Sequence, residues 1–270
     1  MKRELIEKLN NKRLVVNVIK KDPRKIKVPE YKLPTPVLTC EVETIDQYNA
    51  CIEQGIETIY YQNKISRNNS TYVEGFDRVL VGGLNGVEYY KNKCIVTTDY
   101  SLNIVNHESL RVLHEHGVDT VTLSYEINKT DINAVIENYY DKYATYPKVE
   151  LIVYGRQKLM VTKYCPLKRM GMCGKCKTES FSLVDEFAEF PLGFKNCEVT
   201  LYNSKVLNLI DDLKDFEGIS SYRLSFTKES KEETIKVIEM FKNRLNNLED
   251  TTKLFDSKLN TRGHLNKEIM

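Results

Sequence analysis

The sequence predicts an α/β fold of the TIM-barrel-like (β/α)8 kind, and three observations lead to this prediction. Short runs rich in β-branched residues recur along the chain from Val37 onwards. Each run is apolar almost throughout, which is typical of parallel strands covered on both faces. Amphipathic helical patterns separate several of the runs, and alternation of strand and helix favours a parallel sheet surrounded by helices.

Eight runs are predicted to be strands, the number that closes a (β/α)8 barrel. In chain order the predicted strands are residues 37–42, 57–61, 78–83, 94–100, 119–126, 149–155, 198–203 and 221–226.

Five stretches carry helical patterns, over residues 44–55, 106–117, 129–142, 204–215 and 230–245. The second begins at Asn106, whose side chain suits an N-cap, and ends at Gly117. The fifth opens with the capping-box pair Ser230 and Glu233. Residues 62–93 contain no helical pattern, so the sequence leaves it undecided whether the barrel is complete or open.

The same patterns suggest a division of the chain. Residues 1–34 are predicted to be an N-terminal helix followed by a basic connector. Residues 35–248 form the barrel-like domain, with a cysteine-rich loop inserted at 160–197, and residues 249–270 form a C-terminal tail.

The composition excludes several classes of protein. The 40 basic and 38 acidic residues nearly balance, and 41% of residues are hydrophobic, so the chain is neither a polyelectrolyte nor disordered by composition. No apolar run is long enough to span a membrane, and the charged N-terminus lacks the apolar stretch of a signal peptide. We therefore expect a cytoplasmic protein that has no membrane partner.

Seven cysteines fall into two groups. Cys40, Cys51 and Cys94 lie in apolar or amphipathic segments, where a free cysteine packs as a small hydrophobe. The other four follow the pattern Cys165-x7-Cys173-x2-Cys176-x20-Cys197. In a cytosolic protein such a group indicates metal ligands more often than disulfides. Four thiolates suit either a zinc ion or a 4Fe–4S cluster, and the spacing alone leaves both open.

The residues around these cysteines are strongly basic. Seven cations and no acidic residue lie between Arg156 and Lys177. Positive charge there stabilises an anionic thiolate centre, and it also suits contact with the phosphates of RNA. We therefore expect RNA as a partner of the basic loop 156–177.

Polar residues at the ends of predicted strands are candidates for an active site, because the carboxyl ends of barrel strands face it. Asp99, Asn103 and Asn106 follow one strand, and Ser124 and Glu126 end the next. Helix capping is the alternative role for this group, and Asn106 suits it well.

A second group of candidates lies further along the chain. Tyr154 and Arg156 end the strand before the cysteine-rich loop, and Tyr202 and Asn203 end the following strand. Arg156 could bind a carboxylate or phosphate bidentately, or form a structural ion pair. His264 is the one histidine that we select for testing. From both groups, the predicted catalytic residues are Tyr154, Arg156, Asp99, Asn103 and Glu126.

Known hydrolase and nucleotide-binding motifs do not occur. The sequence contains neither H-E-x-x-H nor G-x-S-x-G, and the glycines of "VGGLNG" (81–86) do not have the spacing of a dinucleotide or phosphate loop. The residues themselves therefore provide no protease signature.

Several segments in a consistent order resemble peptidase family U32, also called the collagenase-like proteases. The likeness is greatest to the C-terminal part of the long members that carry a collagenase-like accessory domain. It rests on "DYSLNIVN" (99–106), "VTLSYEIN" (121–128), "VYGRQKLMVTKYCPL" (153–167), "LYNSKVLNLID" (201–211), "YRLSFTKES" (222–230) and "TRGH" (261–264).

The resemblance implies a TIM-barrel-like core and a 4Fe–4S cluster bound by Cys165, Cys173, Cys176 and Cys197, with zinc as the alternative metal. It implies an enzyme of oxygen-independent hydroxylation, acting on an RNA base or a similar small aromatic substrate. The alternatives are a collagenase-like peptidase and a non-catalytic, metal-stabilised accessory subunit. Because the family's N-terminal portion has no counterpart in this chain, a second subunit that completes the fold is a further expected partner.

Overall fold

The computed structural model describes residues 4, 6–8, 32–67, 71–248 and 252–266. Most of the predicted N-terminal helix and basic connector, and part of the predicted tail, therefore lie outside the described residues.

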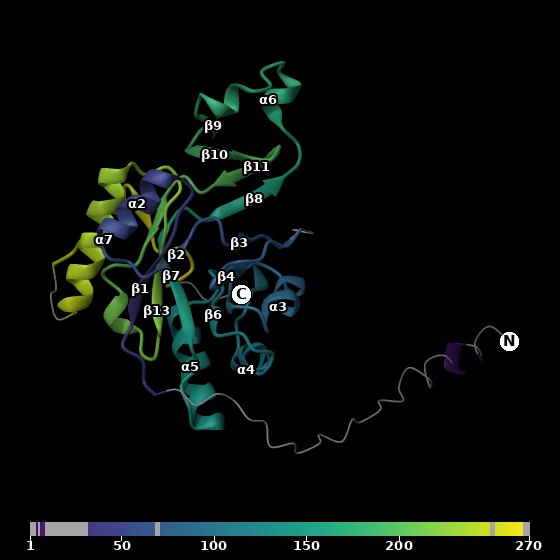
Figure 1. Cartoon of the computed structure of the whole chain (residues 1–270), viewed down its shortest axis with the longest axis vertical. Helices are drawn as coiled ribbons and strands as arrows, with labels where there is room; N and C mark the ends of the chain where they lie inside the picture. The colour runs from purple at the N-terminus through teal and green to yellow at the C-terminus, as the bar shows by residue number, and fades with distance from the viewer. Residues whose placement is uncertain (1–3, 5, 9–31, 68–70, 249–251, 267–270) are drawn as a thin grey trace.

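Eight parallel strands form the main sheet, in the spatial order β2-β1-β13-β7-β6-β5-β4-β3 (Figure 1). Their bounds are β1 Val37–Glu41, β2 Thr58–Tyr60, β3 Lys64–Ile65, β4 Arg78–Val81, β5 Ile95–Thr98, β6 Thr120–Thr122, β7 Val149–Gly155 and β13 Ser221–Ser225.

The two edges of this sheet lie next to each other in the sequence. Only residues 61–63 separate β2 from β3, and the two strands do not pair. Lys64 on β3 bridges the seam, because its Nζ donates to the Val42 carbonyl at 2.9 Å and lies 2.7 Å from Oε1 of Glu43. The sheet is thus a nearly closed barrel, and the predicted incomplete TIM-like fold is confirmed.

Five helices accompany the sheet: α2 Ile45–Glu53, α3 Leu84–Tyr90, α4 His107–Glu115, α5 Lys129–Tyr143 and α7 Lys231–Asn246. Both α2 and α7 begin with complete capping boxes, at Thr44 and Ser230 respectively. These two helices pack side by side over β1 and β13. Asn106 caps α4 by accepting a hydrogen bond from the amide of Ser109, so its predicted capping role is confirmed.

The apolar core lies between the strands and these helices. Buried side chains of α7, such as Ile238 and Phe241, belong to the same cluster as outward-facing strand residues, such as Cys40 and Leu224. Cys40 and Cys51 are fully buried, as predicted, whereas Cys94 is half-buried.

The segment predicted as a cysteine-rich loop instead forms a second, antiparallel sheet of order β8-β11-β10-β9. We call residues 158–202 the cysteine module. Its elements are β8 Lys158–Thr162, α6 Pro166–Arg169, η2 Lys175–Lys177, β9 Phe181–Val184, β10 Glu189–Lys195 and β11 Glu198–Tyr202. Because β8 follows the carboxyl end of β7, the module projects from that end of the barrel (Figure 1).

Three predictions of individual elements were wrong. The predicted barrel strand 198–203 is β11 of the cysteine module, and β3 is the eighth barrel strand instead. Residues 204–215 are not a helix, because β12 (Val206–Asn208) pairs with β7 and with β14 (Asn260–Thr261), and only η3 (Leu213–Asp215) is helical. Within 62–93, α3 forms without a side-chain cap, which explains its weak sequence pattern. None of the helices in the described part of the chain is both long and apolar enough to cross a membrane.

Candidate functional site

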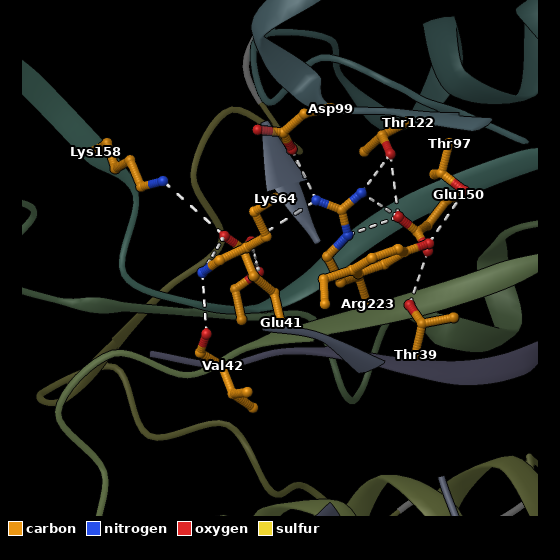
Figure 2. A network of polar contacts seen from close by, with 12 residues as sticks. Thr39, Glu41, Val42, Lys64, Thr97, Asp99, Thr122, Glu150, Lys158 and Arg223 are labelled. Carbon is orange, nitrogen blue, oxygen red and sulfur yellow. Dashed lines mark hydrogen bonds and ion pairs between the residues drawn. The ribbon is translucent and has the colours of Figure 1, made fainter. Parts of the chain in front are cut away.

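The interior of the barrel is polar and charged rather than filled by branched apolar side chains. We call Glu41, Lys64, Asp99, Glu150, Lys158 and Arg223 the interior charge network (Figure 2). Figure 2 shows these side chains converging from different strands. Three are carboxylates and three are cations, so their formal charges balance. A balanced set is required, because an unpaired charge in this environment would cost several kcal/mol.

Arg223 on β13 lies at the centre of the network and is fully buried. Its Nε donates to Oε2 of Glu150 at 2.6 Å, its Nη2 to Oγ1 of Thr122 at 2.6 Å and its Nη1 to Oδ1 of Asp99 at 2.7 Å. Thr122 lies on β6, which is two strands away from β13 in the sheet, and Asp99 follows β5, which is three strands away. Arg223 therefore reaches across the inside of the barrel and ties its strands together.

Glu150 on β7 is the fully buried partner of Arg223. Both of its oxygens are hydrogen-bonded further: Oε1 accepts from the hydroxyls of Thr39 at 2.7 Å and Ser221 at 3.3 Å, and Oε2 accepts from Thr122 at 3.0 Å. A carboxylate with four such partners has no lone pair left for a ligand. Glu150 is thus a structural member of the network.

Glu41, at the end of β1, is surrounded by cations. Oε1 lies 3.4 Å from Nζ of Lys64 and 4.0 Å from Nζ of Lys158, and Oε2 accepts a hydrogen bond from Ser225. Burial raises the pKa of Glu41, but Lys64, Lys158 and Arg223 outweigh burial and hold this pKa well below its ordinary value. Burial lowers the pKa of Lys158, yet Glu41 above all raises it beyond its ordinary value. Both groups therefore stay charged.

Asp99 differs from the other two carboxylates. It directly follows β5, at the carboxyl end of the barrel, and its Oδ2 has no hydrogen-bond partner among the described residues. Burial raises the pKa of Asp99 above its ordinary value, although Arg223 opposes the shift. A carboxylate with one free oxygen and a raised pKa can accept a hydrogen bond or a proton from a substrate.

Tyrosines adjoin Asp99 at this end of the barrel. Burial raises the pKa of Tyr100 and of Tyr202 to about 12, so both hydroxyls are neutral donors at physiological pH. The ring of Tyr100 packs on that of Tyr125 with centroids 4.4 Å apart. Asp99, Lys158 and these phenols thus bring hydrogen-bond donors and an acceptor together at one end of the barrel.

The other predicted residues at the ends of β5 and β6 have separate contacts. Asn103, in the left-handed region at φ 54°, accepts a hydrogen bond from the Ser124 hydroxyl at 2.5 Å, which links the two loops. Glu126 is exposed and lies outside the network. Of this group, only Asp99 belongs to the interior charge network.

The predicted residues near the cysteine module also divide. The ring of Tyr154 packs against Phe226 and Phe241, on the side of the sheet that faces α7. Arg156 donates to the Asn203 and Ser204 carbonyls, which is a structural contact.

Two candidates remain from the second group. Tyr202 lies at the barrel end with Lys158, whereas His264 is exposed at a small hollow beside Ser124 and Tyr125.

Sequence reasoning missed five of the six network residues. Strands that were interpreted as continuous apolar runs carry polar residues at every second position, namely Thr39 and Glu41 on β1 and Ser221, Arg223 and Ser225 on β13. A period of two means that all of these side chains face the same side of the sheet. This alternation was the available signal.

The four candidate ligand cysteines all lie on the cysteine module. Cys165 is the N-cap residue of α6, Cys173 precedes η2 and Cys176 lies within it. Cys197 lies in the turn between β10 and β11. Because Val199 pairs with Thr162 in antiparallel register, the Cys197 turn lies beside the end of β8, which leads into α6. In Figure 1, α6 lies at the end of the module that is remote from the barrel.

Cys197 has an unusual backbone conformation. The two-residue turn places Asn196 at φ 51° and Cys197 at φ 60°. Turns of this kind favour glycine at the second position, because a side chain there costs about 1–2 kcal/mol. A cysteine held in such a conformation is a reason to look for a chemical role.

All four thiols are free, and their chemistry suits an iron–sulfur cluster or zinc. Among the described residues, no three His, Cys, Asp or Glu side chains are gathered closely enough to hold a metal ion. The donor types and their common location on one module thus fit a metal group, whereas the described side chains do not gather into a single set of ligands.

Comparison with known proteins identifies a family. The model of the family described as peptidase family U32 matches residues 43–268. No curated protein and no solved structure matches the chain.

Proposed function

Because the chain belongs to peptidase family U32, we propose that it is an iron–sulfur member of that family. In this proposal Cys165, Cys173, Cys176 and Cys197 bind a 4Fe–4S cluster. The protein then takes part in oxygen-independent hydroxylation of an aromatic base, most simply a base in RNA.

The observation that carries the proposal is the position of the four thiols on one small module that projects from the carboxyl end of the barrel. Cys165 and Cys197 are brought to the same end of that module by the pairing of β8 with β11. When bound, such a cluster supplies one-electron redox chemistry. The strained turn at Cys197 supports a role for this thiol beyond packing.

The exposed surface of the module suits single-stranded RNA. Arg156 donates to the Asn203 carbonyl, Lys158 pairs with Glu41, and Lys175 pairs with Glu179 at 3.7 Å. Among the described residues, this leaves four exposed cations of the module for phosphates: Lys163, Lys168, Arg169 and Lys177. Tyr164, which directly follows Lys163 in the chain, is 58% exposed. Exposed aromatic rings next to cations are the arrangement on which unpaired bases stack.

The barrel end supplies groups that could hold the base itself. The free Oδ2 of Asp99 accepts a hydrogen bond from an amino or imino group, and Lys158 and Tyr202 donate to ring oxygens or nitrogens. Because β8 carries Lys158 at its barrel end and leads to Cys165, one strand connects this end of the barrel with the thiols.

Anaerobic purification tests the cluster directly. We expect about four iron and four sulfide ions per chain and a broad visible absorption band from charge transfer between the thiolates and iron. Cys165→Ser and Cys197→Ser should each lower the iron content, whereas Cys94→Ser, outside the module, should not. A colourless protein with one zinc ion per chain would contradict the proposal and favour the metal-stabilised accessory subunit.

The salt dependence of RNA binding tests the basic surface. Four phosphate contacts predict that log K for a single-stranded oligonucleotide falls with log salt at a slope of about −2.8, from about 0.7 per contact. Lys168→Gln combined with Arg169→Gln should reduce this slope by about 1.4. The control Lys214→Gln, an exposed lysine of η3, should leave it unchanged. Equal slopes for all three proteins would exclude this surface as the RNA site.

The substrate class needs a separate measurement. Mass spectrometry of RNA nucleosides from a strain that lacks the protein should show the loss of one hydroxylated base. If the nucleoside profile is unchanged while a purified, iron-loaded sample cleaves denatured collagen, the peptidase alternative is the correct one.

A further inference from the structure

A second candidate site lies outside the interior charge network. A pocket of about 620 Å³ opens between the first turns of α3 and α4, beside the segments that follow β3, β4 and β5. None of the six network residues lines it. Its volume lies within the range of about 300–1,000 Å³ that is typical of small-molecule sites.

The glycines of "VGGLNG", which match no phosphate-loop spacing, shape the floor of this pocket. A Cβ atom on Gly82 would lie 2.9 Å from both the Arg67 amide nitrogen and the Ser101 hydroxyl. On Gly83, at φ −158°, it would lie 3.2 Å from the Arg67 carbonyl oxygen. Neither glycine has a positive φ, so backbone conformation does not require glycine at these two positions. Glycine is needed because there is no room for a Cβ atom. The two glycines allow the chain at Arg67 to lie directly on the end of β4.

The walls of the pocket are largely apolar. Ile104 and Leu113 are buried beneath it, whereas Leu84 is 66% and Val112 40% exposed. Leu84 and Val112 therefore expose apolar surface to water inside the pocket. A ligand that covers this surface is bound more tightly, because removing apolar surface from water is favourable.

One cation at the rim is open to solvent. Arg67 is exposed and forms no ion pair with any residue that the structure describes. Glu108, the acidic residue of the lining, is already bonded to Arg111 and Lys142, and these contacts, led by Lys142, lower its pKa to about 2. The free charge of the pocket is therefore positive, which complements an anion.

We propose that this pocket binds a small organic anion, whose apolar body covers Leu84 and Val112 and whose carboxylate, sulfonate or phosphate group pairs with Arg67. The site is independent of the cysteine module and of the proposed hydroxylation.

Two fluorescent probes test the proposal on the full chain. The anion 8-anilinonaphthalene-1-sulfonate and the neutral N-phenyl-1-naphthylamine share nearly the same apolar body. We expect one saturable site for the anion with a Kd on the order of tens of micromolar. Arg67→Gln should weaken the anion about five- to tenfold and change the neutral probe by less than about twofold, because only the anion pairs with the guanidinium. Leu84→Ser should weaken both probes.

Matched variants serve as controls. Arg169→Gln removes another exposed arginine, and Leu159→Ser removes a leucine that is 51% exposed on the cysteine module. Neither should alter the Kd of either probe, and the melting temperatures of all four variants should equal that of the unmodified chain. Absence of a saturable site would overturn the proposal. Unchanged affinity of Arg67→Gln for the anion would overturn it equally. So would a loss of probe affinity in the two control variants that is as large as the loss in the two pocket variants.

Discussion

Replacing Arg223 with methionine should destabilise the protein strongly. The side chain is fully buried and is the shared partner of Glu150, Asp99 and Glu41. Methionine fills a similar volume, so packing changes little, but three carboxylates lose their common cation and Glu150 keeps a buried, uncompensated charge. Breaking a buried pair in this way costs about 3–5 kcal/mol. For a chain of this length that corresponds to a melting temperature lower by about 6–10 °C.

A second replacement separates charge from packing. Adding Glu150→Gln to Arg223→Met removes the uncompensated charge and retains an acceptor for the hydroxyls of Thr39 and Ser221. The double variant should therefore be about 1–3 kcal/mol more stable than Arg223→Met alone. Urea unfolding followed by circular dichroism measures both differences. If Arg223→Met is as stable as the unmodified protein, or if adding Glu150→Gln lowers its stability further, the interior charge network does not hold the barrel together as described.

The remaining predictions concern pH and the Cys197 turn. The pKa of Glu41 is lower in the folded than in the unfolded state, so the stability that Glu41 contributes is complete above the unfolded pKa and is lost as the pH falls from there toward the folded pKa. The variant Glu41→Gln should therefore lose less stability than the unmodified protein between about pH 5 and pH 3. The pKa of Asp99 is raised in the folded state, so protonation of Asp99 on acidification favours folding. The variant Asp99→Asn should therefore lose more stability over this pH range than the unmodified protein. Unfolding curves measured at several pH values test both variants, and a steeper loss for Glu41→Gln with a shallower loss for Asp99→Asn would contradict both pKa directions. Cys197→Gly should stabilise the protein prepared without metal by about 1 kcal/mol, because glycine adopts φ 60° without a side-chain clash. The same variant, purified anaerobically, should contain less iron than the unmodified protein. A metal-free glycine variant that melts below the metal-free parent would show that the turn is not strained.

Local patterns were sufficient for most individual elements. The capping residues of α4 and α7 and seven of the eight predicted barrel strands are found where periodicity and caps placed them. Such signals are short-range, so neighbouring residues alone carry them. The strand at 198–203 shows the limit of this reasoning. Its composition suits either sheet, and only its antiparallel pairing with β8 and β10 assigns it to the cysteine module.

The candidate site was predicted less completely. Asp99 was identified because it ends a predicted strand, and it does face the interior. Glu41, Lys64, Glu150 and Arg223 lie inside strands or at a seam, where a charged residue has no recognisable motif. Their partners are up to 184 positions apart in the chain, as for Glu41 and Ser225, so local sequence carries no information on which charges pair.

The α/β class, the capped starts of α4 and α7 and the grouping of four cysteines with basic neighbours could be predicted from the sequence, because they depend on residue type and on spacing within one element. The tertiary structure alone decided that the barrel interior is a balanced set of charges, that the cysteines stand on a sheet of their own, and that Gly82 and Gly83 lie beneath Arg67. The physical reason is that pairing between distant strands, and the burial that follows from it, depend on how the whole chain closes upon itself.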